Sequence, residues 1–288
     1  MTNILLAINI TLMYSAPLIL AGLGGVISEK SGVVNLALEG IMTIGAFAAA
    51  AVAYYTGNVW LGFLAGGLAG AMLAMLHAVS TVVFKADQTI SGVALNFVGP
   101  GLAIFFSRMI FGAVRSNPVA VRLPRMSSSV IAVALVIAMF IFLYKTKWGL
   151  RIIAIGEHPA AADTLGINVN LTRFLCVIAS GVFAGFGGAI FTLSIISIFS
   201  PIVISGAGFI ALAAVIFGKW TPHGLLGACL IFGFFQALSI LLRGYDLPVP
   251  LQVITIMPYL LTIIILVLFV GKSVAPKAVG VPYVKGQN

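Results

Sequence analysis

The feature that most constrains this chain is a series of nearly continuous apolar runs, most of them close to 20 residues long. A helix of about 20 residues spans the roughly 30 Å hydrocarbon core of a bilayer, and it satisfies its own backbone hydrogen bonds there. Transmembrane β-strands instead alternate apolar and polar residues over about ten positions. We therefore expect an all-α fold, a polytopic transmembrane helical bundle.

The composition excludes a soluble protein. Of the 288 residues, 61% are hydrophobic and only 7% are charged, whereas a soluble domain has about 25% charged residues. So few charges could not cover a water-facing surface, and membrane lipid is the expected surrounding. The net charge of +9 is read as a determinant of membrane orientation and not as a sign of nucleic-acid binding.

Hydropathy predicts about 9–10 membrane segments, some of them broken or re-entrant. Nine apolar segments can be delimited: Asn3–Leu23, Val33–Tyr55, Val59–Phe84, Gln88–Phe111, Val130–Tyr144, Leu171–Phe191, Val203–Phe217, Leu225–Leu242 and Leu251–Val270. The fifth and seventh have 15 residues each and would cover only about 22 Å. Either they extend beyond these bounds or they are half-helices. Pro201 and the run Ser205-Gly206-Ala207-Gly208 favour a half-helix for Val203–Phe217.

The basic residues favour an extracytoplasmic N-terminus and a cytoplasmic C-terminus. In that orientation ten of the 15 Lys and Arg residues lie in inner loops and five in outer loops, as the positive-inside rule requires. Residues 1–288 are expected to form a single transmembrane domain. Its longest cytoplasmic loop covers about 145–173.

Small residues at helical spacing indicate close helix packing. Gly62, Gly66 and Gly70 form one such series, and Gly181 and Gly185 form another. Without side chains at these positions, membrane helices can approach until their backbones touch. Packing within one subunit is the preferred interpretation, and a subunit interface is the alternative.

Two glycine-punctuated stretches, 34–40 and 204–209, resemble each other and lie in opposite halves of the chain. Paired interrupted segments of this kind mark the solute site of many transporters built from repeats. Glu39 lies in the first stretch. It is either an intramembrane functional carboxylate or a helix cap that faces the cytoplasm.

Polar and aromatic side chains beside these stretches are the candidates for a solute pathway. Gln88 and Asn96 are eight residues apart and lie near one helix face, where their amides could bind a solute or join helices. Aromatic rings could pack against a planar solute. The full candidate set is Asn35, Glu39, Phe47, Gln88, Asn96, Phe97 and Phe209.

The loop at 145–173 encodes a short surface helix. Pro159 suits the first position of a helix, Ala160–Ala162 are strong helix formers, and Gly166 suits the left-handed residue that ends one. Such a helix is too short to cross the membrane. It is the kind of element through which a membrane subunit can receive force from a soluble partner.

These residues carry a resemblance. Ala161-Ala162-x-x-x-Gly166 looks like the cytoplasmic coupling loop of ABC importer permeases, and the string from Gly149 to Ile167 is similar to the branched-chain amino acid, ribose and nucleoside permeases. Residues 28–40, 86–96, 209–220 and 271–283 resemble the nucleoside and simple-sugar branch. The resemblance implies a type II ABC importer-like fold and nucleoside translocation. It assigns ATPase coupling to Glu157, Pro159, Ala161, Ala162 and Gly166.

The resemblance also implies partners and a location. It predicts an ABC ATPase subunit that binds ATP and Mg, a second homologous permease forming a heterodimer, and an extracytoplasmic substrate-binding lipoprotein. The location would be the bacterial cytoplasmic membrane. This chain itself is expected to bind no cofactor.

Enzyme chemistry is not expected of the chain. Gly271-Lys272-Ser273 ends like a phosphate-binding loop, but Leu266 occupies the position of the required first glycine. Cys176 and Cys229 lie in apolar runs as predicted free thiols, and the three histidines are scattered, so no metal site is expected.

Two other transport functions are alternatives. The first is an ABC permease for ribose-like simple sugars. The second is an ion-coupled secondary transporter, which would need intramembrane ionisable residues; among such residues only Glu39 is suitable, and this function leaves the short cytoplasmic helix unexplained.

Overall fold

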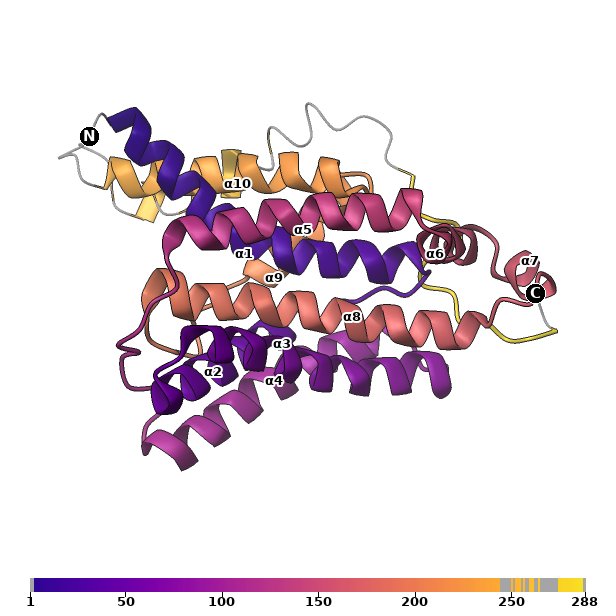
Figure 1. Ribbon diagram of the computed structural model, residues 1–288, viewed down its shortest axis with the longest axis horizontal. Coiled ribbons are helices and arrows are strands. Elements are labelled where there is room, and N and C mark those ends of the chain that lie inside the picture. The colour runs from indigo at the N-terminus through magenta and orange to yellow at the C-terminus, as the bar shows by residue number, and fades with distance from the viewer. Residues whose placement is uncertain are drawn as a thin grey trace.

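The computed structural model describes residues 3–243 and 274–286, and between them only residues 250, 252–254, 256, 259–261 and 264. These residues form an elongated bundle whose long helices run roughly along its long axis (Figure 1). The described helices are α1 (Asn3–Lys30), α2 (Leu38–Thr56), α3 (Val59–Ala78), α4 (Gln88–Phe111), α5 (Arg125–Lys145), α6 (Lys147–Glu157), α7 (Pro159–Thr164), α8 (Val169–Ile190), α9 (Ala207–Phe217) and α10 (Pro222–Leu242). Two π-helical turns, η1 (Val79–Val83) and η2 (Phe191–Ile196), continue α3 and α8.

Seven helices in the described part of the chain are long and apolar enough to cross a membrane. The predicted polytopic helical bundle is therefore confirmed. The predicted Val130–Tyr144 segment is part of the 21-residue α5, so it extends beyond its apolar window and is not a half-helix. The predicted segment Leu251–Val270 lies largely outside the described residues.

The seventh predicted segment is a broken helix, as its composition indicated. Regular helix begins only at Ala207, and α9 has 11 residues. Residues 197–206 before it are non-helical. They lie beside the connection between α4 and α5, since the Val119 amide donates to the Ser197 carbonyl at 2.9 Å.

The first two predicted segments need correction at their boundary. Helix α1 continues to Lys30, past the expected end at Leu23, and α2 begins at Leu38 instead of Val33. A hydropathy window ends where charges begin, but Glu29 is buried and accepts a hydrogen bond from the Trp220 indole. A partner distant in sequence therefore allows the helix to continue through a charged residue.

The predicted glycine series packs α3 against α8. A Cβ atom at Gly70 would lie 2.2 Å from the Gly181 carbonyl oxygen, and one at Gly185 would lie 2.2 Å from that of Gly66. These helices touch through their backbones, as small residues in membrane helices permit. Packing within the subunit, the preferred interpretation of the series, is confirmed.

Candidate translocation site

Two non-helical segments reach into the bundle from its opposite ends. Residues 31–37 connect α1 to α2, and residues 197–206 connect η2 to α9. The first follows the end of α1 that lies near α6, and the second follows the far end of α8 (Figure 1). Helices α2 and α9 therefore both begin inside the bundle, where the start of one helix meets the start of the other.

Glu39, in the first turn of α2, joins these two helix starts. Its Oε1 accepts a hydrogen bond from the Gly206 amide and its Oε2 accepts one from the Gly208 amide, both at 2.7 Å. The N-terminus of a helix offers free amides and a partial positive charge, so it binds a carboxylate well. Each of the two alternatives from the sequence is correct in part. Glu39 lies within the bundle, as an intramembrane carboxylate would, and it also caps a helix, but that helix is α9.

Glycine is needed at both of these positions. Gly206 has a φ of 89°, in the left-handed region, which a residue with a Cβ atom adopts only with strain. At Gly208 a Cβ atom would lie 2.4 Å from the Glu39 backbone nitrogen. The two stretches that resemble each other in sequence are therefore in direct contact in the fold.

Side-chain amides hold the non-helical segment 31–37. Asn96 accepts from the Gly40 amide at 2.9 Å and donates to the Leu36 carbonyl at 2.8 Å. Asn35 accepts from the Ala37 amide at 3.1 Å and donates to the Ser180 hydroxyl at 2.9 Å. Polar backbone away from water must be satisfied within the protein, and these two side chains satisfy part of it.

Val34 is held at both of its backbone groups. The Gln88 side chain accepts from the Val34 amide at 2.7 Å, and a His77 ring nitrogen lies 2.9 Å from the Val34 carbonyl. Gln88 and Asn96 thus serve one segment from one face of α4, the face their spacing indicated. Their side chains bind the backbone of this segment and of the first turn of α2; contact with a solute stays a prediction.

The three aromatic candidates do not converge on one site. Phe47 is buried and packs edge-on against Phe199, with ring centroids 5.4 Å apart. Phe97 is 76% exposed and Phe209 is 50% exposed. Their part in a solute pathway likewise stays a prediction.

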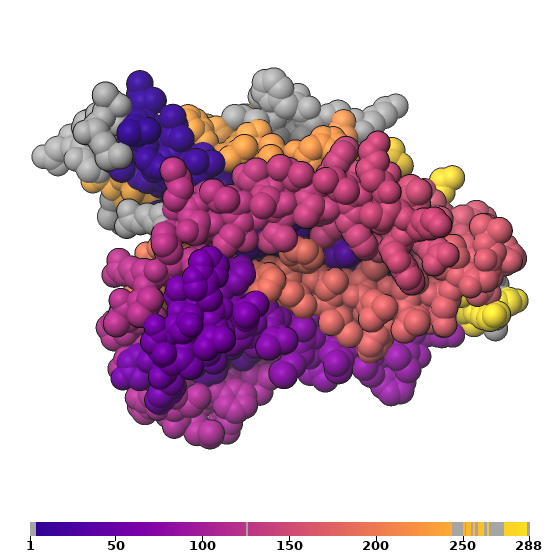
Figure 2. Space-filling model, in the orientation of Figure 1, coloured from indigo at the N-terminus to yellow at the C-terminus, as the bar shows by residue number. Residues whose placement is uncertain are grey.

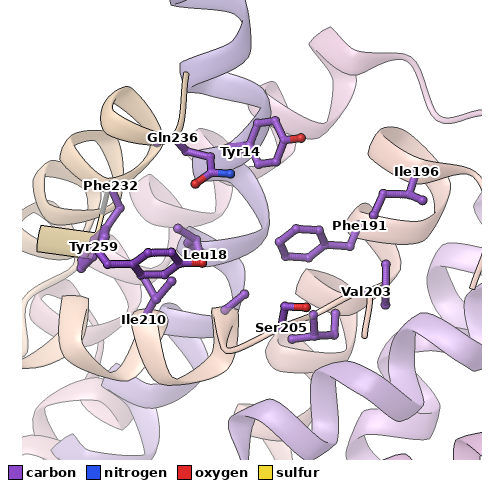
Figure 3. Close-up of a pocket in the computed structure, with 13 residues that line it drawn as sticks. Tyr14, Leu18, Phe191, Ile196, Val203, Ser205, Ile210, Phe232, Gln236 and Tyr259 are labelled. Carbon is purple, nitrogen blue, oxygen red and sulfur yellow. The ribbon is translucent and has the colours of Figure 1, made fainter. Parts of the chain in front are cut away.

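The structure contains a cavity beside the 203–207 segment that sequence reasoning did not find. Its volume is about 170 Å³. Figure 3 shows Phe191 and Tyr259 on opposite sides of it, with Tyr14 and Gln236 near one another. It is lined by residues of α1, η2, the 203–207 segment, α9, α10 and the following chain: Tyr14, Leu18, Phe191, Ile196, Val203, Ile204, Ser205, Ala207, Ile210, Phe232, Gly233, Gln236 and Tyr259.

The cavity combines aromatic rings with a few polar groups, as small-molecule sites do. Gln236 offers an amide, which both donates and accepts hydrogen bonds. Its position as an isolated amide within the apolar run of α10 was a signal for this site in the sequence. None of the seven predicted pathway residues lines the cavity, but Glu39 binds Gly206, which lies between lining residues Ser205 and Ala207.

The predicted surface helix is present as α7. Pro159 occupies its first position, and His158 before it accepts from the Ala161 amide at 3.3 Å. Gly166 has a φ of 78° and adopts the left-handed conformation that its sequence position indicated. The preceding helix α6 was missed. Its 11 residues are amphipathic, and the sequence was interpreted as helical only from Pro159 to Gly166.

Glu157 ends α6, so the predicted coupling residues span the junction of two helices. Ala161 is exposed, whereas Ala162 is 2% exposed and packs inward. The side of α7 that carries Ala161 is therefore available to a partner. In the described residues no group of three or more His, Cys, Asp or Glu side chains could hold a metal.

Comparison with known proteins identifies relatives along almost the whole chain. A family model described as "Branched-chain amino acid transport system / permease component" matches residues 7–270. The guanosine ABC transporter permease protein NupQ of Bacillus subtilis (strain 168) is 44% identical, over 96% of each protein. The nucleoside ABC transporter permease protein NupC of Lactococcus lactis subsp. cremoris (strain MG1363) is 41% identical, again over 96% of each.

A third relative is named for a different substrate. The putative glucose ABC transporter permease protein TsgC13 of Haloferax volcanii is 38% identical over 85% of this chain and 79% of its own length. No solved structure matches the chain. A family match over most of the length, together with full-length relatives above 40% identity, shows that this chain belongs to the family of branched-chain amino acid transport system permease components and is a multi-pass transport subunit, not an enzyme.

Proposed function

We propose that this chain is the permease subunit of an ATP-driven importer that carries nucleosides across a bacterial cytoplasmic membrane. The observation that carries the proposal is its similarity to NupQ and NupC, at 44% and 41% identity over 96% of each protein. Two relatives named for guanosine and nucleoside transport, from different organisms, agree on the class of solute.

The chemistry of the cavity supports this solute class. A nucleoside presents a flat base that stacks on aromatic rings, with ring edges and hydroxyls that form hydrogen bonds. Phe191 and Tyr259 supply rings on opposite sides, and Gln236 and Ser205 supply polar groups. At about 170 Å³ the cavity is smaller than the 300–1,000 Å³ of typical small-molecule sites.

The orientation follows from the basic residues. The helix ends that carry Lys30, Lys145 and Arg173 gather at the same end of the bundle as α6 and α7 (Figure 1). The positive-inside rule assigns that end to the cytoplasm. The C-terminus and the loop at about 145–173 would then be cytoplasmic, and the single permease domain 1–288 would present α7 to an ATPase.

In this proposal the chain binds neither ATP nor Mg, and a partner ATPase supplies the energy. Glu157, Pro159, Ala161, Ala162 and Gly166 form or flank the helix that meets that partner. An extracytoplasmic lipoprotein delivers the solute and provides most of the affinity. The permease then needs only weak contacts that release the solute again.

A ribose-like or other simple sugar is the second candidate, because TsgC13 is 38% identical to the chain. A sugar forms hydrogen bonds through its hydroxyls and has no flat base, so the rings of the cavity favour a nucleoside. An ion-coupled secondary transporter is a weaker candidate. Its best relay residue, Glu39, is bound to two backbone amides.

Reconstitution tests the proposal. The permease would be purified with its ATPase, companion permease and lipoprotein, and placed in liposomes with radiolabelled guanosine, uridine or ribose. We expect ATP-dependent uptake of guanosine or uridine above that of ribose, and none with an ATPase that cannot hydrolyse ATP. Uptake of ribose alone would establish the sugar alternative. Uptake driven by an ion gradient without ATP would reject the ABC mechanism.

A further inference from the structure

Residues 274–286, here called the clamp segment, lie against the end of the bundle formed by α6, α7 and α8. Figure 1 shows this yellow segment beside α6 and α7, and the space-filling view shows it against the same end (Figure 2). The Ala278 amide donates to the Gly156 carbonyl at 2.9 Å, and the Gly280 amide donates to the Gly32 carbonyl at 3.3 Å. The segment therefore binds both α6 and the start of the 31–37 segment.

Arg173, in the first turns of α8, fastens the clamp segment to the same place. Its Nε donates to the Ser31 carbonyl at 3.0 Å and its Nη1 donates to the Val281 carbonyl at 2.9 Å. The side chain is 2% exposed, so water does not compete for these bonds. A guanidinium has donors fixed in one plane, and here they join two pieces of chain that are distant in sequence.

Tyr283 connects the clamp segment to the coupling helix α7. Its ring is 6% exposed and packs in a cluster with Ile155, Ala162 and Val169. Its hydroxyl lies near the Asp163 carboxylate, and burial together with this negative group raises the pKa of Tyr283 above its ordinary value.

A second contact on Asp163 is weaker. Lys285 Nζ lies 3.5 Å from the Asp163 carboxylate, but the Lys285 side chain is 80% exposed. An exposed ion pair contributes little. The buried ring of Tyr283 is therefore the main anchor of α7 to the clamp segment.

Helix α7 depends on such an anchor. It has six residues, far fewer than the 12–15 that an isolated helix needs to be even marginally stable. Its position is set by what packs on it. Along one continuous set of contacts, α7 is joined through Tyr283 to the clamp segment, and the clamp segment is joined through Arg173 and Gly280 to residues 31 and 32.

We propose that the clamp segment is a positioning element for energy coupling, with Tyr283 and Arg173 as positioning residues. It holds α7 to the non-helical segment 31–37. A force on α7 then moves residues 31–37 and does not merely bend the cytoplasmic loop that carries α7. This inference rests on the proposed function, because it takes α7 to be the helix that the ATPase moves.

The first test measures guanosine carried per ATP hydrolysed in the complete importer. Tyr283→Phe removes the hydroxyl beside Asp163 and keeps the ring, and we expect the ratio to fall about two- to five-fold. Tyr283→Ala removes the buried ring, and we expect a fall of about ten-fold or more. ATP hydrolysis and the amount of assembled complex should change much less than the ratio.

The matched control is Val274→Ala in the same segment, where the side chain is 80% exposed. This variant should match the wild type in both activities. If Tyr283→Ala fails to assemble, Tyr283→Phe decides the question. A wild-type ratio in an assembled Tyr283→Ala importer, or in Tyr283→Phe where Tyr283→Ala does not assemble, would overturn the proposal. So would a parallel loss of hydrolysis and transport.

A second readout does not depend on the solute. Ser205→Cys, at an exposed position of the cavity wall, would be labelled with a maleimide after Cys176 and Cys229 are replaced by alanine. In the otherwise wild-type importer, ATP should change the labelling rate; with Tyr283→Ala the change should be lost. If ATP changes the labelling rate but guanosine is not carried, the proposed solute is wrong. The labelling response of Tyr283→Ala still tests the clamp proposal in that case. If Tyr283→Ala keeps the full ATP response, the clamp proposal is wrong.

Discussion

The Glu39 carboxylate lies 2.7 Å from the backbone nitrogen of Gly206, so a side chain of α2 completes the first turn of α9. The two helices start from non-helical segments that enter the bundle from opposite ends. A single carboxylate thus fixes the relative position of both helix starts. It also supports the 203–207 segment, which forms one wall of the cavity.

The charge of Glu39 is expected to be essential. In Glu39→Gln one carboxylate oxygen becomes an NH₂ group, which cannot accept from a backbone amide. Hydrogen bonds to a charged group contribute about 1.5–3 kcal/mol, so nucleoside uptake should fall about ten-fold or more. Uptake by cells, normalised to the protein in the membrane, measures this. Equal uptake by Glu39→Gln and wild type would show that the contact is dispensable.

The close approach of α9 to α2 should not tolerate a methyl group. In Gly208→Ala the new Cβ atom would lie 2.4 Å from the Glu39 nitrogen. We expect a loss of about 1–3 kcal/mol from overpacking, measurable as a lower Tm of the protein in detergent. Gly227→Ala is the control, because a Cβ atom there meets nothing within 4 Å. Equal Tm values for the two variants would contradict the packing described.

Gln236 is expected to contribute to solute specificity. Gln236→Leu keeps the approximate volume and removes the amide. A site built to hydrogen-bond its solute loses transport when the polar group is removed, and we expect guanosine uptake to fall about ten-fold at low concentration. Phe234→Leu, at an exposed position on the same helix, serves as the control. An unchanged concentration dependence in Gln236→Leu would place the solute path elsewhere.

The helix α7 should be required for docking of the ATPase. Replacing residues 159–166 with a glycine–serine linker of equal length removes the helix and leaves the connection to α8. We expect the permease to remain in the membrane but to lose co-purification of the ATPase and all ATP-driven uptake. Retained uptake in this variant would exclude α7 as the coupling helix.

The sequence predicted well those features that depend on neighbouring residues along the chain. Pro159 and Gly166 bound a short helix, because proline suits a helix start and glycine suits the left-handed residue after its end. The glycine series that contain Gly66 and Gly185 predicted close helix packing. A residue without a side chain allows any neighbouring helix to approach closely. The broken helix before Ala207 followed from Pro201 and the glycines in the same way.

The cavity and the clamp could not be predicted in this way. The cavity joins Tyr14 to Gln236, and the clamp joins Tyr283 to Ala162, pairs that only the tertiary fold brings together. The end of α1 was misplaced for the same reason, since the indole that binds Glu29 lies 191 residues away. Which of several phenylalanines lines a path depends on the face of the helix it occupies. A continuous apolar run does not encode that face.

The glycine contacts between α3 and α8 have a mechanical consequence. Where backbones touch, as at Gly70 and Gly181, neither helix can slide or turn without a collision, so this stretch is stiff. Each helix then continues into a π-helical turn, η1 or η2, at opposite ends of the bundle. Such turns occur frequently at functional sites. The stiff stretch therefore ends in a π-helical turn on each helix: η1 adjoins His77, which holds the 31–37 segment, and η2 contributes Phe191 to the cavity.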